Sequence, residues 1–204
     1  MDAILIHGMG RTPAAMSILA ARLRMSGIRP HLFGYSVTFE QWDECIQRYK
    51  NFIEKRAKTN DYIIVGHSLG TVLTRATLPR LTHKPTACFF LAPPTQVCGA
   101  ARNFAHRRLI QLFMGDVGKV LANTQFMESL PLPCVPTKIY AGIAGPRGRY
   151  SPFGEEPNDG LLTVKETRLP SVPLQTVPAL HTFIMNSKVV TQDIVRIVRA
   201  SSTS

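Results

Sequence analysis

Short apolar segments that recur along the chain constrain its fold more than any other feature. They are four to eight residues long, are rich in Ile, Val, Phe and Tyr, and lie near 2–7, 31–35, 61–66, 87–92, 137–143 and 174–180. Such runs are typical of strands in a parallel sheet, whose two faces are both covered by helices. The pattern predicts an α/β protein with a mostly parallel central sheet of about six strands, flanked by helices on both faces.

The stretches between these runs have helical spacing. Helices are expected over about 13–27, 39–57, 68–78 and 187–200. The second helix has an apolar stripe made of Phe39, Trp42, Ile46, Tyr49 and Ile53. Glu44 and Arg48, four positions apart, are expected to pair on its exposed side. At 204 residues the chain fits a single domain over 1–204, and 95–130 and 145–158 are insertions in the regular alternation.

Composition and the N-terminal residues predict the compartment. With 45% hydrophobic and 18% charged residues, the chain has the composition of an ordinary globular protein. The first residues lack a basic region, a long apolar segment and a cleavage site, so no export signal is expected. The apolar runs are far shorter than the roughly 20 residues that cross a bilayer. We therefore expect a cytoplasmic protein.

The net charge of +11 raises the question of an anionic partner. Basic residues are spread along the whole chain, and the densest groups are Arg102-Arg107-Arg108 and Arg147-Arg149. Neither group carries interleaved aromatic residues at the density of a base-stacking platform. Nucleic acid is therefore not an expected partner, whereas an anionic membrane surface and a merely solvated basic surface both stay open.

Four cysteines, Cys45, Cys88, Cys98 and Cys134, are widely spaced along the chain. They form no CxxC or Cys/His pattern, so no metal site is expected. Free thiols in a reducing compartment are favoured, and a Cys98–Cys134 disulfide is the alternative that stays open.

The third apolar run leads directly into a glycine-flanked serine. The segment Asp61-Tyr-Ile-Ile-Val-Gly66-His67-Ser68-Leu69-Gly70 reads as a strand, a G-x-S-x-G turn and the start of a helix. In this nucleophile-elbow context the serine stands on a strained strand-to-helix turn. Side chains at Gly66 and Gly70 are expected to clash with the neighbouring backbone. Ser68 is therefore the candidate nucleophile.

The first strand ends in a second glycine-containing turn, His7-Gly8-Met9-Gly10. With this turn ahead of the serine elbow, the sequence resembles the lipase and esterase branch of the α/β-hydrolase superfamily, and small bacterial lipases in particular. The resemblance covers nearly the whole chain in motif order and implies an α/β-hydrolase fold. It also implies an oxyanion hole formed by the backbone N–H groups of Met9 and Leu69.

A serine hydroxyl needs a base to take its proton, and the chain has six histidines. His181 follows the last predicted strand and precedes the last helix, which is where this family carries its base. His7 and His67 lie within the two turns, where hydrogen bonding and shaping of the site are their expected roles. The remaining three, His31, His83 and His106, lie elsewhere in the pattern.

The third member is expected between Ser68 and His181, in the family's order of serine, acid and histidine. The carboxylates available there are Asp116, Glu128, Glu155, Glu156, Asp159 and Glu166. Asp159 is chosen because Asn158-Asp159-Gly160-Leu161-Leu162 resembles the Asp-Gly-hydrophobic turn of small bacterial lipases. Glu156 is the reserve, and the alternative for Asp159 is an Asx-turn residue that only shapes the loop. The residues from 146 to 157 must fold back to bring Asp159 to the site.

The insertion 95–130 occupies the position of the lid in many members of this family. It carries apolar residues at helical spacing and basic residues before them, namely Leu109, Leu112, Phe113, Val117, Arg102, His106, Arg107 and Arg108. A lid is expected to place apolar side chains over the site and basic ones toward lipid headgroups. An ordinary helix packed on the sheet is the alternative.

Together these features predict a serine hydrolase without cofactor or metal that cleaves a carboxylic ester, such as an acylglycerol, through an acyl-enzyme. Its expected partner is a small-molecule or lipid acyl ester. Thioesters and amides stay open because they use the same oxyanion chemistry. A binding protein that retains the fold without catalysis is the alternative from another class.

Overall fold

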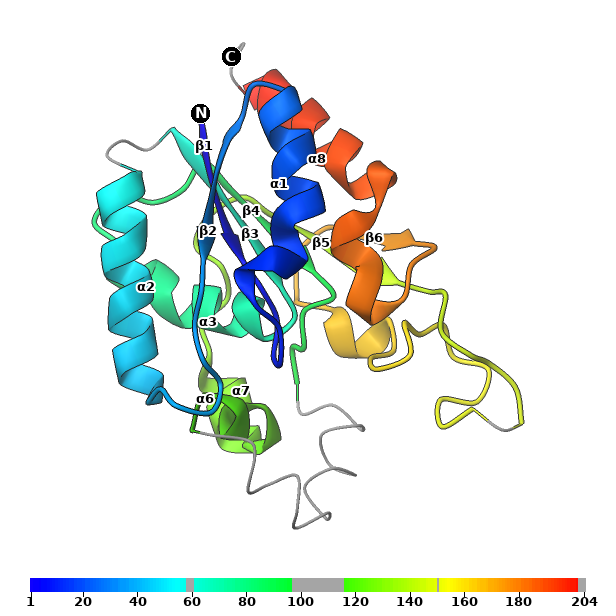
Figure 1. Cartoon of the computed structure of the whole chain (residues 1–204). Helices are drawn as coiled ribbons and strands as arrows, with labels where there is room; N and C mark the ends of the chain where they lie inside the picture. The colour runs from blue at the N-terminus through cyan, green and yellow to red at the C-terminus, as the bar shows by residue number, and fades with distance from the viewer. Residues whose placement is uncertain (58–60, 97–115, 150, 202–204) are drawn as a thin grey trace.

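The computed structural model describes residues 1–57, 61–96, 116–149 and 151–201, and a six-stranded sheet forms its centre (Figure 1). The strands are β1 (Asp2–Ile6), β2 (Arg29–Phe33), β3 (Tyr62–His67), β4 (Ala87–Leu91), β5 (Thr137–Gly142) and β6 (Leu174–Val177). Their order is β2-β1-β3-β4-β5-β6, and every neighbouring pair is parallel. The predicted α/β fold with a six-stranded sheet is confirmed.

Helices cover both faces of this sheet, as predicted. The main ones are α1 (Ser17–Met25), α2 (Trp42–Arg56), α3 (Leu69–Thr77) and α8 (Lys188–Ser201). Short 3₁₀ turns precede α1 (Pro13–Met16), follow α3 (Leu78–Arg80) and precede α8 (His181–Asn186), and a further one spans Lys165–Thr167. In Figure 1, α1 and α8 lie side by side on one face, and α2 and α3 lie on the other.

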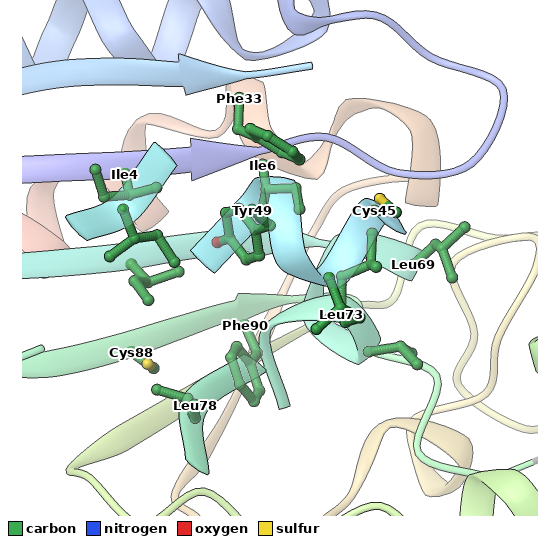
Figure 2. Packing of buried hydrophobic residues seen from close by; sticks show 14 of the residues in the cluster. Ile4, Ile6, Phe33, Cys45, Tyr49, Leu69, Leu73, Leu78, Cys88 and Phe90 are labelled. Atoms are coloured by element: carbon green, nitrogen blue, oxygen red, sulfur yellow. The ribbon is translucent and has the colours of Figure 1, made fainter. Parts of the chain in front are cut away.

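Successive side chains of each strand enter different cores. Ala3 and Leu5 of β1 belong to the apolar cluster under α1 and α8, whereas Ile4 and Ile6 belong to the cluster under α2 and α3. Figure 2 shows the second cluster, where Ile4 and Ile6 lie near Tyr49 of α2. This two-residue alternation, with both sides buried, explains why the central strands are apolar throughout.

The strands β2 and β6 differ most from the predicted bounds, whereas the other four agree within one residue at each end. β2 spans Arg29–Phe33 rather than 31–35. It is an edge strand, where Pro30 is tolerated because its missing N–H group is not needed by a second neighbour. β6 ends at Val177 rather than near 180, because Pro178 cannot donate to the ladder.

Two predictions about α2 are wrong. The helix begins at Trp42, so Phe39 lies before it and is 90% exposed instead of contributing to the apolar stripe. Arg48 forms its ion pair with Glu40 rather than with Glu44. Glu40 stands in the turn before the helix, so the i,i+4 spacing within the helix does not identify it as the partner.

The described part of the 95–130 insertion packs beside α2 and α3. It contains α6 (Asp116–Lys119), a 3₁₀ turn (Val120–Ala122) and α7 (Thr124–Ser129). Val117 and Met127 are buried in the same cluster as α2 and α3. Phe126 packs edge-on against Trp42, with 5.0 Å between ring centroids. The basic and apolar residues from Arg102 to Phe113 lie outside the described residues, so the lid stays a prediction.

The sheet order creates a topological switch point at the carboxyl ends of the strands. β1 pairs with β2 on one side and with β3 on the other, so the connections that leave the carboxyl ends of β1 and β3 diverge. Ligands of α/β proteins bind at such switch points. Because Ile6 is in register with Gly66, the turn that begins at His7 and the turn that contains Ser68 emerge side by side.

Candidate active site

Ser68 stands in a strained backbone conformation between β3 and α3. Its φ of 49° and ψ of −122° lie in a region that non-glycine residues rarely adopt. The Ser68 amide donates to the Leu91 carbonyl at 2.9 Å, and the Thr71 hydroxyl donates to the Ser68 carbonyl at 2.7 Å. These contacts hold the turn in its strained form and place Ser68 at the first turn of α3, as the elbow pattern predicts.

Two glycines make this close turn sterically feasible. A Cβ on Gly70 would lie 2.6 Å from the His7 carbonyl oxygen and 2.8 Å from the Ile6 carbonyl oxygen. A Cβ on Gly66 would lie 3.2 Å from backbone atoms of Gly70 and Thr71. The expected clash is therefore severe at Gly70 and milder at Gly66. At Gly70 it comes from the neighbouring strand β1 and the residue after it rather than from the turn itself.

The structure brings Ser68, His181 and Asp159 together in one hydrogen-bonded chain. His181 Nε2 lies 3.0 Å from Ser68 Oγ, and His181 Nδ1 lies 2.7 Å from Asp159 Oδ2. A carboxylate only accepts, so Nδ1 carries the proton, and Nε2 of the neutral ring is free to accept from the Ser68 hydroxyl. His181 is 7% exposed and Asp159 is 2% exposed, so solvent competes weakly for these bonds.

Asp159 uses its two carboxylate oxygens for different tasks. Oδ1 accepts from the amides of Leu161 and Leu162 at 2.9 Å and 2.7 Å, which is an Asx-type turn. Oδ2 accepts from His181, whose amide also donates to the Asp159 carbonyl at 2.9 Å. Turn shaping and histidine orientation were alternatives in the sequence, yet in the structure they occur together.

Asn158 closes the long loop that precedes the acid. Its side-chain amide donates to the carbonyls of Pro146 and Glu156, both at 2.9 Å, and its Oδ1 accepts from the Gly160 amide at 2.9 Å. The fully buried Asn158 therefore ties the start of the loop to its end. The sequence motif contained Asn158, but its role was not predicted. The signal available was a polar residue immediately before the acid in a turn.

His67 connects the serine turn to the histidine turn. Its Nε2 donates to the His181 carbonyl at 2.9 Å, since a carbonyl can only accept. Burial and the neighbouring His181 lower the pKa of His67 to about 3, so the ring is neutral near pH 7. No described residue partners the buried Nδ1 atom of His67. The predicted shaping role is consistent with this bond, although its partner was not foreseen.

His7 is held within the first turn. Its Nδ1 donates to the Gly8 carbonyl at 2.9 Å, and its ring stacks on Tyr35 with 4.4 Å between centroids. Burial lowers the pKa of His7, which keeps this ring neutral as well. A Cβ on Gly8 would lie 2.8 Å from His67 Nδ1 and 2.9 Å from Ser68 Cβ. The first turn therefore lies directly against the serine turn.

Two backbone N–H groups near Ser68 have no hydrogen-bond acceptor in the part of the chain that the structure describes. Neither Met9 nor Leu69 donates a backbone hydrogen bond there, and Leu69 is the first residue of α3, where amides have no intrahelical acceptor. Such amides are available to an oxyanion. The Leu69 side chain lies in the α2–α3 core (Figure 2) and does not border the site, whereas Met9 is partly exposed.

Glu156, the reserve candidate for the acid, does not take part in the hydrogen-bonded chain with His181. Glu156 pairs with Lys165 and has no bond to His181 among those found in the described residues. The described residues hold no cluster of three or more His, Cys, Asp or Glu side chains suited to a metal ion. Cys45, Cys88 and Cys134 are free thiols, and Cys98 lies outside the described residues.

Comparison with solved structures identifies the fold. A lipase of Bacillus licheniformis in its mature form has a TM-score of 0.76 and 17% identity over 97% of this chain and 91% of its own. A pyrethroid hydrolase from Sphingobium faniae has a TM-score of 0.66 and 15% identity over 100% and 99%. An extracellular alpha/beta-hydrolase from a Paenibacillus species has a TM-score of 0.64 and 11% identity over 97% and 98%. The chain has the α/β-hydrolase fold.

Comparisons by sequence give no further identification. No protein-family model and no curated protein sequence matches the chain. Among the described helices, none has both the length and the apolar character needed to cross a membrane.

Proposed function

We propose that this protein is a serine hydrolase that cleaves carboxylic esters through a Ser68–His181–Asp159 triad. The observation that carries the proposal is the continuous hydrogen-bonded chain from the Ser68 hydroxyl to the Asp159 carboxylate, 3.0 Å and 2.7 Å per link. It ends on a serine in a strained strand-to-helix turn. A chain of this kind activates a hydroxyl that is otherwise a poor nucleophile.

In the proposed reaction, Ser68 Oγ attacks the ester carbonyl carbon while His181 Nε2 takes the hydroxyl proton. Asp159 keeps Nδ1 protonated and stabilises the imidazolium that forms. The same proton then goes to the leaving alcohol, which departs as the acyl-enzyme forms. Water attacks the acyl-enzyme with His181 again as base, and the carboxylic acid and free Ser68 are released.

The developing oxyanion needs fixed donors, and the amides of Met9 and Leu69 supply them in this proposal. Leu69 follows the nucleophile, and Met9 belongs to the turn that lies against it. Peptide amides act here through position and not through side-chain chemistry. The proposal therefore assigns no catalytic role to the Met9 thioether or the Leu69 isobutyl group.

Apolar side chains in the same turns favour an ester with an apolar acyl or alcohol part. Met9, Leu161, Leu180 and Phe183 are each between 40% and 56% exposed, and each lies within three residues of a proposed site residue. Exposed apolar side chains beside a reactive group offer apolar contacts to a substrate. The structural similarity to a lipase also supports a lipid-like or other acyl ester.

Hydrolysis of a series of p-nitrophenyl esters from acetate to palmitate tests the proposal. We expect measurable turnover for the parental protein and a loss of about 10⁴-fold or more for Ser68→Ala. Ser201→Ala makes the same chemical change at an exposed serine in the last turn of α8, and it serves as the matched control with unchanged turnover. The chain length with the highest kcat/KM then defines the acyl preference.

Two results would change the proposal. If thioester or anilide analogues turn over faster than the matched esters, the bond type is wrong while the triad stands. If no ester, thioester or amide turns over and a fluorophosphonate fails to label Ser68 in folded protein, the triad is inactive. A binding protein that retains the fold is then the correct conclusion.

A further inference from the structure

Helix α1 is apolar on both of its sides. Its inner side chains, Leu19, Ala20 and Leu23, are buried in the core, as expected for a helix that covers a sheet. Its outer side exposes Ile18, Ala21 and Met25, at i, i+3 and i+7, and Met25 is 86% exposed. A surface helix normally presents polar residues to water. The outer row of α1 is therefore an apolar surface without a partner within the described part of the chain.

Helices α1 and α8 lie side by side (Figure 1). A groove on this side is lined by residues of both helices. Its volume is about 680 Å³, and it is lined by Arg22, Met25, Ser26, Lys188, Thr191, Gln192, Val195, Arg196 and Arg199. The lining contains three arginines and one lysine but no carboxylate. The groove therefore combines an apolar component with an excess of positive charge.

The cations of α8 lie on one stripe. Lys188, Arg196 and Arg199 are separated by eight and three positions, so they project from the same side of the helix. Arg196 also donates to Asp193, but Asp193 is turned toward the sheet, where Tyr140 donates to it at 2.7 Å. The same carboxylate also pairs with Lys138 of β5, so one negative charge is shared between two cations and offsets Arg196 only in part.

A second hollow on the other flank of α1 continues the pattern. It is lined by Ser17, Ala20, Ala21, Arg24, Met25, Pro30 and Leu32, again without a carboxylate. Met25 borders both hollows and stands out between them, with Arg22 on one flank and Arg24 on the other. An apolar ridge between cationic flanks is the pattern by which helices lie in a membrane interface.

We propose that the α1–α8 face docks the protein on an anionic phospholipid bilayer. Ile18 and Met25 enter the region just below the headgroups, while the three arginines and the lysine of the groove contact lipid phosphates. A bilayer is favoured over an acidic peptide because Met25, 86% exposed, stands on the ridge between the two hollows, and the exposed Ile18 lines neither of them. None of the residues that line the groove belongs to the proposed active site, so this docking is separate from catalysis.

Flotation of the full chain with vesicles tests this proposal. One set of vesicles is pure phosphatidylcholine, and the other contains one part phosphatidylglycerol to two parts phosphatidylcholine. We expect binding to the anionic set alone. The double variant Lys188→Glu/Arg199→Glu is expected to bind roughly tenfold or more weakly, because each cation near an anionic membrane contributes measurably. Met25→Ser is expected to bind severalfold more weakly at every salt concentration.

The matched control is Lys55→Glu/Arg80→Glu, which makes the same change in net charge on the α2–α3 side of the sheet. It is expected to bind within about twofold of the parental protein. Equal weakening by both double variants, equal binding to neutral vesicles, or binding of polyglutamate without binding to vesicles would each overturn the proposal. Thermal unfolding of each variant shows that it is folded, and Ser68→Ala must bind as the parental protein does.

Discussion

The proposed active site joins two regions that are built in different ways. The nucleophile region, from Gly66 to Gly70, is a single short turn whose shape is set by close backbone contacts with β1 and β4. The acid–base region brings Asp159 and His181 together from two separate connections, after β5 and after β6, and holds them by hydrogen bonds. Close backbone contacts shape the first region, and side-chain hydrogen bonds join the two halves of the second.

This difference predicts different consequences of damage. A side chain added at Gly66 or Gly70 forces backbone atoms apart, so it costs stability and function together. A change in the acid–base region can preserve the fold and still lose the orientation of the histidine. Apart from replacement of the Ser68 hydroxyl itself, substitutions that separate stability from activity should therefore be found on the acid–base side.

The largest difference between the loss of activity and the loss of stability is expected for Asp159→Asn. Asparagine keeps an oxygen for the amides of Leu161 and Leu162, so the turn and the stability should be retained. Its NH₂ group then faces His181 Nδ1 and favours the wrong histidine tautomer. We expect kcat to fall by about 10³- to 10⁴-fold, measured on the best p-nitrophenyl ester.

Asp159→Ala is the comparison for that variant. It removes the turn acceptor as well as the histidine partner, so we expect an additional loss of about 1–2 kcal/mol in the free energy of unfolding. If Asp159→Asn retains more than a tenth of the parental turnover, Asp159 is a turn residue and not a member of the triad.

A smaller effect, in which stability and activity fall together, is expected for Gly70→Ala. The new methyl group would lie 2.6 Å from the His7 carbonyl oxygen, so β1 and the serine turn must separate. We expect a loss of about 2–3 kcal/mol in unfolding free energy, together with reduced turnover, by denaturant titration and ester assay.

Gly154→Ala is the matched control for Gly70→Ala. Gly154 has a φ of 57° but no atom near the position of a Cβ, so alanine there has strain without a clash. A cost of about 1 kcal/mol with normal turnover is expected. Equal costs at the two glycines would mean that contact with β1 does not shape the elbow.

The same contrast explains what could be predicted from sequence. Sheet order aside, the six strands and the elbow depend on local patterns, namely apolar runs and two glycines around Ser68, and these patterns are visible in a single chain. β2 and β6 form the two edges of the sheet, and their ends were misplaced because Pro30 lies within the first strand whereas Pro178 follows the last residue of the second. Phe39 was wrongly assigned to the helix because it fits the helical spacing of the apolar residues, although the helix begins three residues later, at Trp42.

Contacts between distant segments were harder to predict. The hydrogen bond from His67 to the His181 carbonyl links residues 114 positions apart, and Asn158 closes its loop by a bond to Pro146, 12 positions away. No periodic pattern encodes such bonds, because they depend on how two loops meet above the sheet. The choice of His181 and Asp159 rested on motif order in a known family, and their catalytic roles stay predictions until the triad is tested.

His67 offers a test of how the two regions communicate, because it belongs to the first and bonds to the second. Leucine removes the donor to the His181 carbonyl, and we expect kcat to fall by roughly tenfold with little change in KM. Glutamine can place an N–H near the position of Nε2 and should restore most of that loss. The apparent pKa of kcat/KM is to be measured for each variant.

Two outcomes decide between positioning and packing. If glutamine and leucine lower kcat equally, the hydrogen bond has no positioning role and only the shape of the ring matters. If the leucine variant loses stability but keeps its pH profile and kcat, His67 is a core residue and not a link to His181.

The smallest effect concerns the support of the acid–base region by α8. Asp193 accepts from Lys138 and Tyr140 of β5, which ties the helix after His181 to the strand before Asp159. Burial raises the pKa of Asp193, but these donors and Arg196 outweigh it and hold that pKa at about 2. The folded pKa lies below the unfolded value of about 3.9, so Asp193 contributes stability above pH 4 and loses it as pH falls toward 2.

After allowance for screening by solvent, we expect Asp193→Asn to lower the unfolding free energy by about 1–2 kcal/mol at pH 7 and to converge with the parental protein near pH 2. Asp43→Asn, at an exposed position 3.9 Å from Arg80, should leave the acid limb of the stability curve unchanged. Hydrogen exchange at pH 3 should then show faster opening of α8 than of α3, since the sequence of α3 contains no carboxylate. If α3 instead opens faster than α8, the nucleophile region is not more resistant to acid than the acid–base region.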